Sequence, residues 1–431
     1  MTDSEIASQQ GAASPTQQAV PAIAGWLLVG IGFFALAVSF SARAAFSLAM
    51  PVWNRDLGWS TSFSSFAGAA ALIVMALVAP FAGNLVDRHG PRRLLALGLV
   101  AIAAGMTLVA LLPRGWALLV GFSLIAAIGF GMVAQHVVVT AIIRVMREKR
   151  GLASGVATSG STAGQLLLVP LLAMFMQQGG WRWSFFAFGL AGLALAGFIY
   201  LLPQQGGAPR SPEPRTAARH DESLRHRLGF LLGQPAFHAL FWSFLICGFT
   251  TTGAIETHLL PFAAFCGLPP LPSATAYGLL SAVNFTGMIL AGWLADRMNR
   301  PLLLGLIYIL RAISFVVLFF VTQNNDGDLR LLTLFAVFFG LVDYATVPVT
   351  ASLVASHLGL RIMGLAMGLI AAGHAIGGAL GAFFGGWLAE KTGGYDGLWS
   401  TSLALALLAG MMALLLREKP TDSPILVKTS S

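Results

Sequence analysis

The chain has 431 residues, of which 57% are hydrophobic and only 10% are charged. A soluble globular protein carries roughly 25% charged residues, so a surface with this few charges excludes a soluble protein of this length. Two cysteines also exclude a disulfide-stapled scaffold. Cys247 and Cys266 lie in apolar surroundings and are interpreted as small core residues. The composition predicts an all-α membrane protein.

Long apolar runs predict the membrane-spanning helices. A hydrocarbon core about 30 Å thick needs roughly 20 helical residues, and unbroken apolar runs exclude transmembrane β-strands, which alternate in polarity. The twelve expected spans are 23–50, 61–83, 92–112, 116–143, 150–176, 183–202, 236–264, 273–295, 301–321, 330–355, 362–388 and 397–416.

Basic residues fix the expected orientation, because they concentrate in cytoplasmic loops. With both ends inside, 18 basic residues fall in cytoplasmic segments and 5 in outer loops. We therefore expect a multi-pass protein of the inner (plasma) membrane with both termini in the cytoplasm. The net charge of +8 is then a matter of topology and not of nucleic-acid binding. Residues 1–22 are expected to be a disordered tail without a signal peptide, and 417–431 a second cytoplasmic tail.

An internal repeat divides the chain into two halves. The pattern Gly-x3-Asp-Arg occurs at 83–88 and again at 292–297, and a longer glycine pattern at 151–164 returns at 364–377. Glycines four residues apart let membrane helices pack backbone to backbone. The repeat predicts two pseudo-symmetric six-helix bundles, 23–202 and 236–416, joined by a cytoplasmic linker at 203–235. In such a protein the substrate site lies between the halves.

These motifs resemble a known family. GNLVDRHGPRR (83–93) resembles the loop signature of the major facilitator superfamily, and GWLADRMNR (292–300) resembles a weaker copy. Within that superfamily, REKRGLASGVATSG, GGWRWSFFAFG and ETHLLPF are similar to the monocarboxylate-porter and oxalate/formate branch. The resemblance implies the major facilitator fold and a small-molecule transporter.

The resemblance also implies gating residues. A charged latch closing the cytoplasmic side would contain Asp87, Arg88 and Arg92, with Asp296 and Arg297 as its second copy. Loop charge alone would explain the arginines but not an aspartate beside the membrane. In one respect the chain departs from the branch, whose members carry an arginine four residues after a polar residue of the eighth helix. Here Asn284 is followed by Met288, so an anion-binding arginine must lie elsewhere.

Three ionisable residues are expected near the bilayer midplane, where a charge costs about 3 kcal/mol and needs a partner. Arg311 and Asp343 could form an ion pair with His374 within proton-relay distance. The alternative is a purely structural pair between the ninth and tenth helices. Under the 213-residue offset of the glycine repeat, Ser161 is the counterpart of His374, so the two could face a small polar substrate from opposite sides.

A second pair comes from the outer parts of the first and seventh helices. Arg43 and Glu256, with His258 nearby, could form an extracellular gate. Alternatively, Arg43 itself binds an anionic substrate, or it reaches the membrane interface with a long side chain. Gln135, His136 and Gln165 could line the path or merely bridge helices.

No phosphate-binding loop, dinucleotide motif, metal-ligand spacing or activated nucleophile occurs, so we expect neither an enzyme nor a cofactor. We expect a monomeric secondary transporter that works by rocking of its two halves and moves a small organic anion, with a monocarboxylate favoured. Proton coupling is favoured because Asp343, Glu256 and His374 can bind protons. The alternatives are an exporter of amphipathic drugs or metabolites by proton antiport and a transporter-like sensor. The expected substrate contacts are Arg43, Ser161, Gln165, Asn284, Arg311 and His374.

Overall fold

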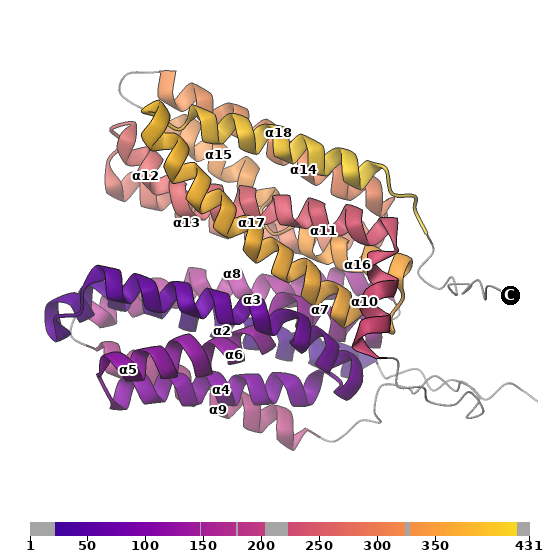
Figure 1. Ribbon diagram of the computed structural model, residues 1–431, viewed down its shortest axis with the longest axis horizontal. Helices are drawn as coiled ribbons and strands as arrows, with labels where there is room; N and C mark the ends of the chain where they lie inside the picture. The colour runs from indigo at the N-terminus through magenta and orange to yellow at the C-terminus, as the bar shows by residue number, and fades with distance from the viewer. Residues whose placement is uncertain (1–21, 147, 178–179, 203–222, 324–327, 420–431) are drawn as a thin grey trace, which may run out of the picture.

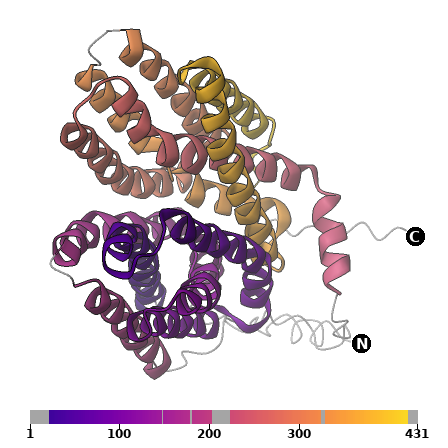
Figure 2. The ribbon, with the colours of Figure 1, turned by 60° about the vertical axis from the view of Figure 1, so that its left-hand side comes forward.

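The structure is a computed structural model that describes residues 22–146, 148–177, 180–202, 223–323 and 328–419. Within these ranges the regular secondary structure is helical and no strand occurs. Figure 1 shows two helical bundles lying one above the other, and the turned view of Figure 2 shows the same separation. The expected tails lie outside the described residues except for Ala22 and residues 417–419, as does 203–222 of the linker.

The first bundle contains α2 (Ala22–Leu57), α3 (Thr61–His89), α4 (Pro91–Leu111), the consecutive segments α5 (Gly115–Leu118), η1 (Leu119–Ala126), α6 (Ala127–Met132) and α7 (Gln135–Val145), then α8 (Arg150–Gln177) and α9 (Trp181–Leu201). The short helix α10 (Leu224–Leu232) precedes the second bundle. That bundle contains α11 (Pro235–Gly248), η2 (Phe249–Glu256), α12 (Thr257–Phe265), α13 (Pro270–Ala295), α14 (Arg300–Gln323), α15 (Leu329–Val342), α16 (Thr346–Leu358), α17 (Met363–Thr392) and α18 (Asp396–Leu414).

The helices are long enough to cross a membrane. Among the described residues, eleven helical segments meet the length and hydropathy that a span requires. The remaining long helix is α8, which has 28 residues. Some of its side chains are not among those that the structure describes. The fold expected from the sequence, an all-helical membrane protein, is therefore confirmed.

Two helices run six or seven residues past their expected ends. α2 was expected to stop at residue 50 and α3 at residue 83, but they continue to Leu57 and His89. Glycines follow both, Gly58 with φ +67° and Gly90 with φ +80°, a left-handed backbone that glycine adopts without a steric cost. Apolar length sets only the minimum span, whereas these glycines set the actual helix ends.

Two expected spans are broken. The fourth pass is interrupted between α6 and α7 at residues 133–134, and the tenth between α15 and α16 at residues 343–345. The second break has a local cause, because Pro348 would clash with the carbonyl of Tyr344 if the helix continued unbroken. No proline or glycine occupies the first break. The pseudo-symmetric halves thus share discontinuous helices at equivalent positions, where a continuous span was expected.

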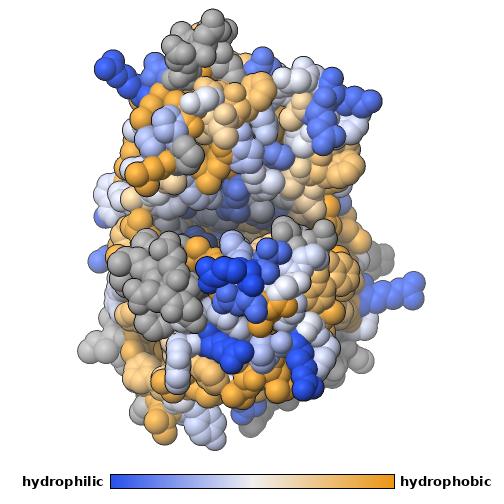
Figure 3. Space-filling view, turned by 90° about the vertical axis from the view of Figure 1, so that its left-hand side faces the viewer, coloured by the Kyte–Doolittle hydropathy of each residue, from blue (hydrophilic) through white to orange (hydrophobic). Residues whose placement is uncertain are grey.

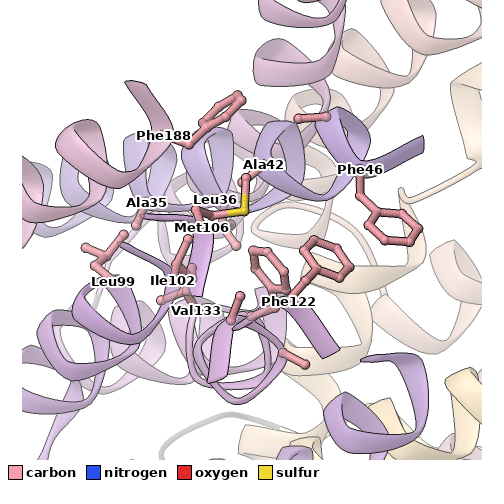
Figure 4. Packing of buried hydrophobic residues seen from close by; sticks show 14 of the residues in the cluster. Ala35, Leu36, Ala42, Phe46, Leu99, Ile102, Met106, Phe122, Val133 and Phe188 are labelled. Atoms are coloured by element: carbon pink, nitrogen blue, oxygen red, sulfur yellow. The ribbon is translucent and has the colours of Figure 1, made fainter. Parts of the chain in front are cut away.

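Each bundle has its own apolar core. In the first, Leu36 of α2 packs with Leu99 and Met106 of α4 and with Phe122 of η1, as Figure 4 shows. In the second, Phe315 of α14 belongs to a separate apolar cluster. A third apolar cluster crosses between the bundles, because it joins Val139 and Ile143 of α7 to second-bundle residues such as Val354.

Candidate functional site

The bundles are joined at one end of the molecule by the carboxylate of Asp87, at the end of α3. Oδ1 accepts a hydrogen bond from the backbone N–H of Gly364 at 2.8 Å, and Oδ2 accepts one from Leu365 at 3.0 Å. Arg144 of α7 pairs with Oδ1, and Arg227 of α10 pairs with Oδ2 at 2.6 Å. The side chain of Asp87 is only 2% exposed. A carboxylate of the first bundle thus caps the N-terminus of α17 in the second. We call these five residues the first lock.

The repeat supplies a reciprocal contact. Asp296, which follows α13 of the second bundle, accepts hydrogen bonds from the backbone N–H groups of Gly151 at 2.7 Å and Leu152 at 2.9 Å. These two amides belong to the first turn of α8 in the first bundle. We call these three residues the second lock. Each bundle therefore contributes one aspartate that caps a helix of the other bundle.

Glycines explain how the helices come close enough for this capping. A Cβ atom built on Gly83 would overlap the carbonyl of Gly364, and one built on Gly292 would overlap the carbonyl of Gly151. Neither position therefore accommodates a side chain without a shift of backbone. The repeated glycines are contacts between the bundles at the latch end, the end of the molecule that carries both locks.

The arginines expected in the latch have other contacts. Arg92 donates from Nε to the carbonyl of Ile199 at 2.9 Å and from Nη2 to that of Leu202, at the end of α9 in its own bundle. These contacts of Arg92 stay within the first bundle, and its assignment to the latch remains a prediction. Arg297 lies over the ring of Trp293 at 4.1 Å, on the preceding turn. Arg88 is exposed at the end of α3.

The opposite end of the molecule is hollowed. Figure 3 looks onto the left-hand end of Figure 1 and shows a furrow between the two lobes. Partly accessible polar side chains occur along the facing helices, among them Arg43 and His374. The molecule is therefore open between its bundles at one end and closed by the two locks at the other.

Arg311 is fully buried in the second bundle. Its guanidinium donates to the Sγ of Cys247 at 3.0 Å and to the hydroxyl of Thr250 at 3.2 Å. It also donates to the carbonyl of Val342 at 2.7 Å and to the backbone carbonyl of Asp343. Arg311 therefore binds the carbonyl end of α15, where the helix dipole is negative. The expected ion pair with the Asp343 carboxylate is not formed, because the break exposes backbone carbonyls that take its place.

The carboxylate of Asp343 points to a different partner. Oδ2 accepts a hydrogen bond from the side-chain amide of Asn284 at 3.3 Å, whereas Oδ1 is buried without a partner among the described residues. Asn284 also donates to Thr162 of the first bundle at 3.5 Å and accepts from the N–H of Tyr344 at 3.2 Å. This carboxylate lies beside a contact between the two bundles.

His374 of α17 is half-buried and adjoins the Arg311 network. Its Nε2 lies 3.3 Å from the hydroxyl of Thr251, and its ring centroid is 6.4 Å from that of Tyr344. The thiol of Cys247 lies in the same network, 3.5 Å from the hydroxyl of Thr346. No group of three His, Cys, Asp or Glu side chains that could hold a metal ion occurs in the described part of the chain.

The expected gate is not formed in this open state. Glu256 is exposed and accepts a hydrogen bond from the hydroxyl of Tyr344 at 2.8 Å. Arg43 stacks on the ring of Phe40 at 3.9 Å, and its Nε has no hydrogen-bond partner among the described residues. Arg43 and Glu256 interact electrostatically, although no ion pair within 4.0 Å joins them. His258 is buried and turned to the carbonyl of Ala382 at 2.9 Å.

The polar residues of the first bundle are less concentrated. Ser161 is buried, accepts a hydrogen bond from Gln135 at 2.9 Å and donates to the carbonyl of Thr158 at 2.7 Å. It is thus hydrogen-bonded within its own bundle and not to its counterpart His374. Gln165 is exposed on α8, and His136 is buried.

Sequence reasoning missed four residues of these networks. Arg144 and Arg227 were assigned to loop charge, and only their tertiary contact with Asp87 distinguishes them. Cys247 was interpreted as an apolar core residue, yet its thiol contacts Arg311. Tyr344 follows Asp343 directly, and its position one residue from an intramembrane acid was the available signal.

Comparisons with known proteins agree with this architecture. A model of the Major Facilitator Superfamily matches residues 32–324 and 285–430. The uncharacterized MFS-type transporter YcxA of Bacillus subtilis is 26% identical over 332 residues, which cover 75% of this chain and 78% of that protein. Monocarboxylate transporter 11 of Homo sapiens is 26% identical over 396 residues, covering 89% and 81%.

Solved structures share the fold. The proton:xylose symporter XylE, bound to 6-bromo-6-deoxy-D-glucose, superposes with a TM-score of 0.67 at 16% identity, covering 89% of this chain and 94% of that one. A variant of the E. coli fucose:proton symporter FucP gives a TM-score of 0.67 at 16% identity, with 90% and 97% covered.

Proposed function

Because this chain belongs to the major facilitator superfamily, we propose that it is a secondary active transporter that carries a small organic anion together with protons. A monocarboxylate is the favoured substrate, as the similarity to monocarboxylate transporters supports. The bundles 23–202 and 236–416 are the two units that rock against each other around the site. The structure then corresponds to the state that is open at one end and locked at the other.

One observation supports the proposal that the substrate is an anion. The guanidinium of Arg43 in the first bundle interacts electrostatically with Tyr344 and Glu256 of the second, and no carboxylate among the described residues forms an ion pair with it. A cation in a membrane segment costs free energy unless an anion pairs with it. A carboxylate substrate supplies that anion, and guanidinium–carboxylate hydrogen bonds are among the strongest in proteins.

The second bundle supplies the opposite wall. The rings of His374 and Tyr344 lie there with their centroids 6.4 Å apart, and Thr251 orients the imidazole. An anion held between Arg43 and these groups contacts both bundles. Contacts to both sides let the bundles close over the substrate.

Two carboxyl groups support proton coupling. Asp343 is buried with one oxygen unpartnered among the described residues, and Glu256 is exposed. A buried carboxylate oxygen without a hydrogen bond is costly, so binding of a proton at Asp343 relieves that cost. Asn284 links Asp343 to Thr162 of the other bundle, which ties the proton site to the contact that breaks when the bundles rock.

The orientation follows from the basic loops. The latch end faces the cytoplasm in this proposal, and the furrow faces outward, with both termini inside and the chain in the plasma membrane as a monomer. Asp87 and Asp296 are then the cytoplasmic gate. Arg311 positions the break that carries Asp343 and Tyr344 and does not contact the substrate.

The test is uptake of labelled lactate, pyruvate, acetate and oxalate into proteoliposomes, with and without an inward proton gradient. We expect accumulation of one acid that a protonophore abolishes. Arg43→Ala should lower the uptake by up to about 100-fold, because a lost charge-assisted contact costs up to about 3 kcal/mol. Arg43→Lys should retain part of it. The matched control is Arg55→Ala on the same helix, whose guanidinium is exposed and pairs with Asp56 at 2.8 Å.

Two results would contradict the proposal. Uptake of the acid that is equal in Arg43→Ala and Arg55→Ala would remove Arg43 from the site. Export of a cationic amphipathic compound that does not depend on Arg43 would favour the exporter alternative. His374→Gln should flatten the pH dependence of uptake, and an unchanged profile would exclude His374 from proton coupling.

A further inference from the structure

A cavity lies beside the second lock at the latch end. It measures about 630 Å³ and extends between the start of α8 in the first bundle and the turn from α13 to α14 in the second. Four cations line it, namely Lys149, Arg150, Arg297 and Arg300. A cavity of this size holds a small molecule or a headgroup.

The acids that also line the cavity are largely engaged elsewhere. Both oxygens of Asp296 accept backbone hydrogen bonds in the second lock. The carboxylate of Glu418 is held by Arg300, with its Oε1 2.8 Å from Nε and its Oε2 2.6 Å from the backbone N. Glu148 is exposed at the rim. Four cations against three carboxylates leave the lining with a net charge of +1, and among the described residues no acid forms an ion pair with Lys149 or Arg297.

Lys149 is held in a costly backbone conformation. Its φ is +52°, and it is the only residue other than glycine with a positive φ among the described residues. A lysine in the left-handed region costs of order 1 kcal/mol, and such strain clusters at ligand sites. The conformation places Lys149 at the wall of the cavity, directly before the first residue of α8.

The first lock shows what fills the equivalent space in the other half. There, Arg227 of α10 and Arg144 of α7 lie against Asp87 between the bundles. The residue equivalent to Arg144 under the 213-residue offset is His357, which contacts the carbonyl of Arg417 at 2.9 Å. The second lock thus has a basic cavity where the first has a packed helix.

We propose that this cavity binds a phosphate group, which bridges Lys149 of the first bundle and Arg297 of the second. Guanidinium and ammonium groups pair with phosphate by charge-assisted hydrogen bonds. The phosphate belongs either to an anionic phospholipid headgroup of the adjoining leaflet or to a soluble phosphate compound. Because the ligand contacts both bundles, it stabilises the state in which the latch end is closed and slows its opening.

The test uses the full-length protein in nanodiscs and measures amide hydrogen exchange at the start of α8 and at the turn from α13 to α14. One arm compares phosphatidylcholine discs with discs that also contain phosphatidylglycerol. The other arm titrates inorganic phosphate into phosphatidylcholine discs at constant ionic strength. We expect slower exchange at both segments in at least one arm.

Two double variants distinguish binding at this cavity from a general effect of net charge. Lys149→Gln with Arg297→Gln should weaken the ligand about 30-fold, since each basic side chain near an anionic surface contributes about a factor of five. The control, Arg93→Gln with Arg225→Gln, removes the same charge from exposed positions of the latch end outside the cavity. The ligand affinity of this control variant should stay within about twofold of the affinity of the native protein.

Each outcome decides the proposal. Protection by phosphatidylglycerol alone identifies a lipid headgroup, and protection by inorganic phosphate identifies a soluble ligand. Absence of protection in both arms would overturn the proposal. An equal loss in both double variants would also overturn it, because the effect would then arise from net charge and not from the cavity.

Discussion

The two locks come from the same repeated motif but differ in their surroundings. Asp87 and Asp296 each cap a helix of the opposite bundle through two backbone amides. The carboxylate of Asp87 is in addition enclosed by Arg144 and Arg227 and is almost fully buried. Asp296 is exposed and borders an open cavity. The backbone geometry is symmetric, whereas the charge around it is not.

This difference indicates that the two locks contribute differently to closure of the latch end. The capping geometry is shared because the glycines that permit it are repeated, so both locks break when the bundles rock apart. The buried ion network occurs at one lock alone, and a buried charge that loses its partner is expensive. We therefore expect the first lock to determine how firmly the latch end is closed, and the second to tolerate change.

Asp87→Asn should have the largest effect. Removal of the carboxylate leaves Arg144 and Arg227 facing each other without an acid, which should destabilise the closed latch end by about 3 kcal/mol. Amide exchange at Gly364 and Leu365 should then accelerate about 100-fold, and substrate turnover should slow more than substrate binding. Unchanged exchange at these two amides would show that the carboxylate does not hold the lock.

The glycine pair tests the symmetric part of the comparison. Gly83→Ala and Gly292→Ala should each cost about 2 kcal/mol, because the new methyl group meets backbone of the other bundle. Equal effects on exchange at α17 and α8 are expected. A harmless Gly292→Ala beside a damaging Gly83→Ala would mean that the second lock is not tightly packed.

Arg227→Gln tests whether α10 belongs to the first lock. The change removes a hydrogen-bonded ion pair but leaves Arg144 on Asp87, so we expect a loss of about 1.5 kcal/mol. Arg225→Gln is the matched control, since that arginine is exposed on the same helix α10 and should have less than about 0.5 kcal/mol of effect on the lock. Unfolding transitions and exchange at α17 measure both. Equal effects of the two variants would remove α10 from the lock.

Asp296→Asn should have the smallest effect of the series. An exposed cap contributes about 1 kcal/mol, and Asn also accepts hydrogen bonds from a helix N-terminus. Exchange at Gly151 and Leu152 should rise only a few-fold. An effect as large as that of Asp87→Asn would refute the asymmetry between the locks.

Much of the lock could be predicted from the sequence. The repeat identified both aspartates and the glycines beneath them, because such motifs recur at a fixed offset. The partners of Asp87 could not be found in the same way, since Arg144 is 57 residues away and Arg227 is 140 residues away. Among many loop arginines, no local pattern distinguishes the two that reach the carboxylate from Arg92, which caps α9.

The interior of the second bundle shows a different limit of prediction from the sequence. Counting residues along each helix placed Arg311 and Asp343 at similar depth, and the structure does bring them together. The contact goes to the backbone of Asp343 and not to its carboxylate, because the helix is broken there and offers free carbonyls. A continuous helix has none to offer, so a pairing inferred from depth alone chose the wrong atom.

The sequence by itself determined the membrane class, the all-helical fold and the positions of the capping aspartates. These depend on composition, apolar length and repetition, which are local or periodic properties of the chain. Only the tertiary structure decided which arginines surround Asp87, where α7 and α16 begin, that Arg43 has no ion-pair partner among the described residues, and that a basic cavity adjoins Asp296. Each of these depends on which surfaces meet, and packing between distant helices decides that.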